Sequence, residues 1–77
     1  MPKAKAFADL TRGDRIRILG RVYTVDVIDS HADLVELKSK GATRTITLMP
    51  HGREPGRYVL STFRKNHTVD GYTKVES

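Results

Sequence analysis

Residues 13–28 read GDRIRILGRVYTVDVI, and this stretch decides the fold. Its apolar residues alternate with polar ones, at Ile16, Ile18, Tyr23, Val25 and Val27. A period of two is typical of strands that bury one face. Gly20 can adopt positive φ, so we expect a type II′ turn over Leu19–Val22, with Gly20 at its first central position. The stretch therefore predicts a β-hairpin whose apolar face the rest of the chain must cover.

The same alternation recurs further along the chain and predicts strands at residues 34–38, 43–48 and 58–63. Pro50 should end the second of these, because proline lacks the N–H donor of a strand ladder. Asp70-Gly71 is a strong type I′ turn signal and predicts a last hairpin around residues 66–76. No helical periodicity of useful length occurs. We therefore expect an all-β protein, a small barrel or rolled antiparallel sheet of five to seven short strands.

Length and composition indicate one small domain. The chain has 77 residues, and a chain of this size buries only about 60% of its unfolded surface. We expect a mobile basic arm at 1–8 and a single domain at 9–77. Cysteine is absent, so neither disulfides nor a thiolate zinc site can hold it together. No apolar run is long enough to span a bilayer, and the expected location is the cytoplasm, with no membrane partner.

The net charge of +5 is concentrated in one segment. Residues 1–8 carry +2, residues 9–37 carry −2, residues 38–69 carry +6 and the last eight residues carry −1. Such asymmetry indicates a polyanionic partner or an acidic protein surface. Arg15 and Arg17 lie outside the basic segment and close to Asp14 and Asp26, so we expect their field to be offset.

The opening run DLTRGDRIRILGRVYTVDVI resembles the start of small SH3-like barrels of the KOW and translation-protein type, such as the amino-terminal domain of elongation factor P. In these domains a Gly-Asp turn precedes a hydrophobic strand, a Gly turn and a second strand with an inward aromatic residue. The resemblance covers roughly residues 9–48. It implies an SH3-like barrel, often a module that contacts RNA, DNA or ribosomal surfaces. The chain is also similar in style to compact accessory proteins of high-GC bacteria and their phages.

Catalytic patterns are sparse. His31, His51 and His67 fall in three separate predicted loops, so metal ligation would require them to converge. The glycines never form a phosphate-binding pattern such as GxxxxGK or GxGxxG. We expect a protein that is not an enzyme and has no metal or cofactor.

The leading hypothesis is a nucleic-acid-binding module that contacts backbone phosphates through the basic segment. The predicted site consists of Lys38, Lys40, Arg44, Arg53, Arg57, Tyr58, Arg64 and Lys65. Tyr58 and Tyr72 are the candidate stacking rings, although Tyr23, Tyr58 and Phe63 are also needed to fill a small core. The alternative is a protein-interaction or regulatory module that docks an acidic partner through the 49–57 loop or an edge strand. Self-association belongs to the same alternative, because a thin core gains from a partner.

Overall fold

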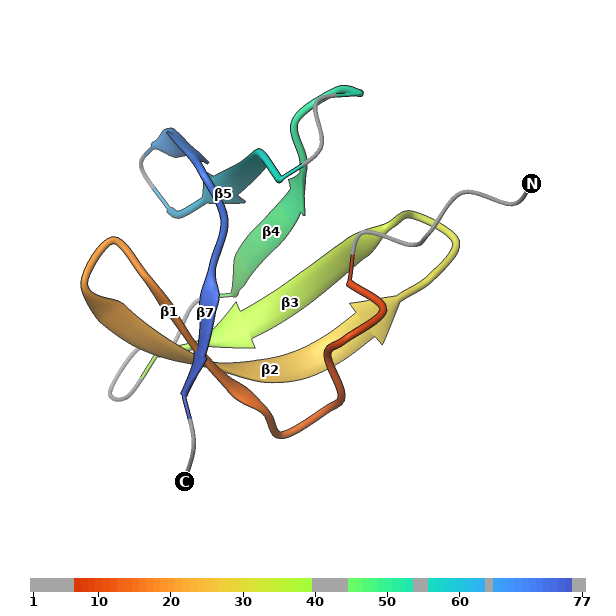
Figure 1. Ribbon diagram of the computed structural model, residues 1–77, viewed down its shortest axis with the longest axis vertical. Helices are drawn as coiled ribbons and strands as arrows, with labels where there is room; N and C mark the ends of the chain where they lie inside the picture. Colours follow the sequence, from red (N-terminus) through yellow and green to blue (C-terminus); the bar gives the residue numbers. More distant parts are fainter. Residues whose placement is uncertain (1–6, 40–44, 54–55, 64, 76–77) are drawn as a thin grey trace.

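The computed structural model describes residues 7–39, 45–53, 56–63 and 65–75. These residues form seven strands and contain no α-helix. The strands are β1 (Arg15–Ile18), β2 (Arg21–Asp29), β3 (Leu34–Lys38), β4 (Ile46–Pro50), β5 (Tyr58–Ser61), β6 (Asn66–Val69) and β7 (Thr73–Val75). All pairings are antiparallel and the sheet curls into a half-barrel (Figure 1). The predicted fold class, a rolled antiparallel sheet of five to seven strands, is confirmed.

The strands form a meander that ends with a long return. Their order in the sheet is β6-β5-β4-β3-β2-β1-β7, so β7 comes back to pair with β1. The hairpin predicted around residues 66–76 is therefore wrong. Gly71 has a φ of 117°, but Asp70 does not have the positive φ that a type I′ turn requires at both central positions. Pairing with other strands outweighs the local turn signal, because β6 pairs over its whole length with β5 and β7 pairs with β1.

The β1–β2 turn forms one residue earlier than predicted. Ile18 pairs with Arg21, so the two loop residues are Leu19 and Gly20. Their φ values are 52° and 78°, and positive φ at both positions makes this a type I′ turn instead of type II′. The hairpin itself forms as predicted, and Leu19 adopts the left-handed conformation.

The predicted bounds of β3 are confirmed, but the alternation expected along β2 is broken by a bulge. The pairing with β3 shifts between Val25 and Val27, so Asp26 is an extra residue in β2. A bulge moves the following side chains to the other face. Val27, expected in the core, is 39% exposed. Its neighbour Ile28 pairs with the buried Val35 but is itself 37% exposed.

Two other strands are displaced from their predicted ranges. β4 begins at Ile46 and does end at Pro50, whereas the predicted strand covered 43–48, of which 43 and 44 lie outside the described residues. β5 ends at Ser61 because a turn follows, in which the Thr62 N–H donates to the Lys65 carbonyl over 2.9 Å.

The core is a single layer on the concave face of the sheet. Its buried members are Phe7, Leu10, Ile16, Ile18, Tyr23, Val25, Val35, Leu37, Leu48, Leu60 and Val69. Phe7 and Leu10 come from the segment before β1 and close the open side of the layer. Phe7 is only 5% exposed and fills the core. The predicted arm at 1–8 falls mostly on residues 1–6, which lie outside the described residues.

Candidate functional site

The residues predicted to form one basic surface belong to two opposite ends of the sheet. Successive turns of an antiparallel meander alternate between the two ends of its strands. Lys38 ends β3 and Lys65 precedes β6, which places both at the end that also holds the β1–β2 turn. Arg53, Arg57 and Tyr58 belong to the β4–β5 connection at the opposite end. Lys40, Arg44 and Arg64 lie outside the described residues.

We call the first of these the basic end, and define it by residues 18–21, 38–39, 45–46, 61–63 and 65–66, the described parts of the connections from β1 to β2, β3 to β4 and β5 to β6. These described residues include Arg21, Lys38 and Lys65, and neither Asp nor Glu. Arg21 and Lys65 are exposed, and neither forms an ion pair within the described part of the chain. Exposed cations that form no ion pair produce a positive potential that attracts anions. The turns of this end that contain described residues lie on the left of Figure 1.

Lys38 has a carboxylate partner on the neighbouring strand. Its Nζ lies 3.7 Å from Oδ2 of Asp26, the bulged residue of β2, and the Lys38 side chain is 68% exposed. An ion pair this exposed contributes roughly 0–1 kcal/mol to stability. Lys38 can therefore exchange Asp26 for an external anion at little cost.

The opposite end of the sheet mixes positive and negative side chains. Asp29 and Asp33 lie in or beside the β2–β3 turn. Asp70, which follows β6, lines a pocket together with Leu19 of the β1–β2 turn. The Nε of Arg57 lies 3.2 Å from Oδ1 of Asp70. Arg53 is exposed in the β4–β5 loop. The carboxylates here reduce the positive field that the two arginines create.

Two large apolar side chains are exposed at the basic end. Leu19 in the β1–β2 turn is 65% exposed, and Phe63 in the β5–β6 turn is 61% exposed. The expectation that Phe63 helps to fill the core is therefore wrong. The chain turns back into β6 directly after Ser61, so Phe63 falls in the turn instead of on the inward face of a strand. Sequence alternation gave no sign of this, because the predicted strand continued through residue 63.

Tyr58 and Tyr72, the candidate stacking rings, lie in an aromatic cluster instead of on the basic end. The ring centroid of Phe7 lies 5.4 Å from that of Tyr58 and 6.3 Å from that of Tyr72. The two tyrosine rings are 5.4 Å apart in an edge-to-face arrangement. Both are half-buried, and this burial raises the pKa of each phenol. Both tyrosine rings pack against the core and so contribute to the stability of the fold.

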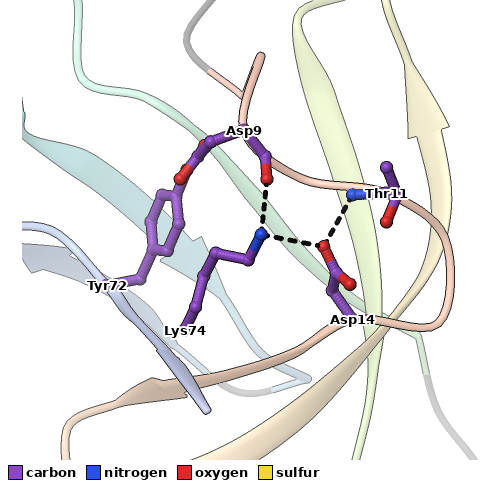
Figure 2. A network of polar contacts seen from close by, with 5 residues as sticks. All are labelled: Asp9, Thr11, Asp14, Tyr72 and Lys74. Atoms are coloured by element: carbon purple, nitrogen blue, oxygen red, sulfur yellow. Dashed lines mark hydrogen bonds and ion pairs between the residues drawn. The ribbon is translucent and has the colours of Figure 1, made fainter. Parts of the chain in front are cut away.

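A polar network joins the segment before β1 to the last strand (Figure 2). The Tyr72 hydroxyl donates to Oδ1 of Asp9 over 2.5 Å, and Lys74 Nζ donates to the Asp9 carbonyl over 2.8 Å. Lys74 also lies 3.4 Å from Oδ2 of Asp14, which accepts a 2.9 Å hydrogen bond from the Thr11 N–H. That backbone hydrogen bond is the main reason why the pKa of Asp14 is lowered. The network holds the residues that cover the core against β7.

Asp14 and Asp26 were expected to offset the field of Arg15 and Arg17. Both carboxylates are paired with lysines in the structure. The two arginines are exposed and alternate with buried isoleucines, so they lie on the convex face of β1. They add to the positive charge beside the basic end.

The described residues contain no cluster of three or more His, Asp or Glu side chains that could hold a metal ion. His31, His51 and His67 lie respectively in the β2–β3 turn, in the β4–β5 loop and in β6. Among the described residues, no helix is long and apolar enough to cross a membrane.

A comparison with known protein families, curated proteins and solved structures found no match for this chain. The similarity of its opening hairpin to SH3-like barrels of translation proteins stays a resemblance of residues 9–48.

Proposed function

We propose that this protein is a small nucleic-acid-binding module that holds the phosphate backbone of its ligand at the basic end. The observation that supports the proposal is the separation of charge between the two ends of the sheet. The described residues of the basic end include Arg21, Lys38 and Lys65 and no Asp or Glu, whereas the β2–β3 turn at the opposite end carries Asp29 and Asp33.

Phosphate contacts are the chemistry that this arrangement favours. Lys and Arg side chains bind phosphate oxygens without reading the bases, and each contact releases condensed counterions. Arg21, Lys38 and Lys65 belong to three separate connections of the sheet, so they could contact one backbone at more than one phosphate.

The test is a titration of a labelled mixed-sequence oligonucleotide at several salt concentrations. About four contacts to a single strand predict a slope of log affinity against log salt near −3, and each lost contact reduces its magnitude by ~0.7. We expect Lys65→Ala and Arg21→Ala to weaken binding to unrelated sequences about equally and to reduce the slope. Both side chains are exposed, so folding should not change.

Arg53→Ala is the matched control, because Arg53 is an exposed cation at the opposite end of the sheet. It should leave the slope unchanged. Absence of binding at low salt would exclude the proposal, and equal losses from Arg53→Ala and Lys65→Ala would exclude this location. A shallow salt dependence would favour an acidic protein partner instead.

A simpler observation comes from the purified protein. With three tyrosines and no tryptophan, the chain absorbs weakly at 280 nm. Co-purified nucleic acid would therefore raise the ratio of absorbance at 260 nm to that at 280 nm sharply, and nuclease treatment should lower it again.

A further inference from the structure

The convex face of β1, β2 and β3, which are neighbours in the sheet (Figure 1), carries cations beside the basic end. Arg15 of β1 lies opposite Thr24 of β2, which in turn lies opposite Lys38 of β3. Arg17 lies on the same face of β1, two residues further along. We call these four residues the convex row. Resting on the function proposed above, we propose that the phosphate backbone of the ligand crosses the convex row and that Asp26 competes with it for Lys38.

Both arginines of the convex row are available to a ligand. They are exposed and alternate with buried isoleucines, which fixes them on the outer face. Neither Arg15 nor Arg17 forms an ion pair within the described part of the chain. Asp14, the residue before Arg15, lies 3.4 Å from a lysine of β7. Asp70 lines a pocket together with Arg17, but its carboxylate lies 3.2 Å from an arginine of the β4–β5 connection.

The spacing of the convex row follows from the geometry of the sheet. Neighbouring strands lie ~4.8 Å apart, so the backbones of Arg15 and Lys38 are about 10 Å apart across β2, and those of Arg15 and Arg17 about 7 Å apart along β1. The Thr24 hydroxyl lies between the two outer cations. Hydroxyl, guanidinium and ammonium groups all bind phosphate oxygens. One phosphate backbone could therefore contact several members of the row.

This face offers phosphate contacts without base stacking. The structure describes β1, β2 and β3 in full, and their one aromatic residue, Tyr23, is buried in the core. Contacts to phosphates position a nucleic acid but carry no sequence information. We therefore expect the convex row to strengthen binding to unrelated sequences alike.

Asp26 is the residue that limits this binding. It is the extra residue of the bulge in β2, and its Oδ2 lies 3.7 Å from the Lys38 Nζ. The Lys38 side chain is 68% exposed, so a phosphate could reach it from solvent. That phosphate would then lie close to the carboxylate it displaces, and like charges repel. Glu36, on the same face of β3 as Lys38, marks the border of the row toward β4.

The first part of the experiment removes the cations of β1. A labelled mixed-sequence single strand is titrated at several salt concentrations with the parent, Arg15→Gln, Arg17→Gln and the control Arg53→Gln. We expect each β1 variant to weaken binding and to reduce the magnitude of the salt slope by ~0.7, equally for unrelated sequences. Arg53→Gln, at the opposite end of the sheet, should leave the slope unchanged. All four proteins should have equal thermal melts, because the changed side chains are exposed.

The second part removes the competing carboxylate. Asp26→Asn should raise the affinity up to about 5-fold, the most that an exposed ion pair is worth. The gain should disappear when Asp26→Asn is combined with Lys38→Ala. Asp33→Asn is the matched control, because it changes the net charge equally at the opposite end and asparagine tolerates the φ of 53° found there. It should raise the affinity much less.

The outcomes separate this inference from the proposed function. Affinities equal to that of the parent for Arg15→Gln and Arg17→Gln, beside weakened binding by Lys65→Ala, would overturn the inference and leave the proposed function standing. Equal gains from Asp26→Asn and Asp33→Asn would overturn it too, because net charge alone would then explain them. Tighter binding of labelled polyglutamate than of the oligonucleotide would overturn both in favour of an acidic protein partner. If the parent binds no oligonucleotide, the inference fails together with the proposed function.

Discussion

Leu19 shows how a single residue can be placed against its own preference. Its φ of 52° lies in the left-handed region, which costs a residue with a Cβ roughly 1–2 kcal/mol. The type I′ turn requires this conformation because its twist matches that of the two strands. Local sequence favoured a turn centred on Gly20 and Arg21, and only the observed pairing of Ile18 with Arg21 shows the true position.

Leu19→Asn should therefore stabilise the protein. Asparagine tolerates the left-handed conformation, and Asn-Gly is a preferred type I′ pair, so we expect the free energy of unfolding to rise by about 0.5–1 kcal/mol. Leu19 is mostly exposed, so little packing is lost. Denaturation in urea measures the change. Leu19→Ala is the control and should bring no such gain, and a less stable Asn variant would contradict this account of the turn.

At the scale of the elements, the segment before β1 and the strand β7 depend on each other through the network around Asp9 and Lys74. Asp14 is the titrating group of that network whose pKa is lowered, first by the Thr11 N–H and to a smaller extent by Lys74. A carboxyl with a lowered pKa in the folded state stabilises it above the ordinary pKa of 3.8, and this contribution is lost as the pH falls through the lowered value.

We expect Asp14→Asn to be less stable than the parent at neutral pH, by an amount that stays constant down to the ordinary pKa. Below that pH the difference should shrink, because the parent carboxyl becomes protonated and its charge is lost. Chemical denaturation at a series of pH values measures the difference. A stability gap that persists unchanged down to about pH 2 would show that the charge of Asp14 does not matter.

Elements with strong local patterns could be predicted, and elements whose partners are distant could not. β3 was predicted with its observed bounds, because Val35 and Leu37 alternate with polar residues between two clear turns. The pairing of β7 with β1 has no local signal, and Asp70-Gly71 pointed to a different partner. The bulge at Asp26 is equally hidden, since one extra residue in β2 leaves no mark on its composition.

For the molecule as a whole, a core one layer thick makes each central side chain important. Leu48 is fully buried in β4, and its neighbour Met49 is 38% exposed on the other face. Leu48→Ala should cost about 2–5 kcal/mol, a large share of the roughly 4–12 kcal/mol expected for a domain of this size. Met49→Ala should cost much less, below about 1 kcal/mol. Thermal melts of both variants test the comparison, and equal losses would contradict the one-sided core.

The candidate site was predictable in its charges but not in its arrangement. The sequence shows the excess of Lys and Arg after residue 38. The prediction, however, placed residues from both ends of the sheet on one surface. The predicted meander could have separated the two groups of residues, because its successive turns lie at opposite ends of the strands. Phe63 could not have been found in this way, because its exposure depends on where β5 stops and β6 begins.

The return of β7 to β1 also has a consequence during synthesis. Ladder pairing joins residue 15 to residue 75, so the sheet cannot be completed until nearly the whole described chain has left the ribosome. Until then β1 presents an unpaired edge to its surroundings, and contacts so distant in sequence form slowly. The nascent chain should thus acquire protease resistance only after residues 73–75 emerge.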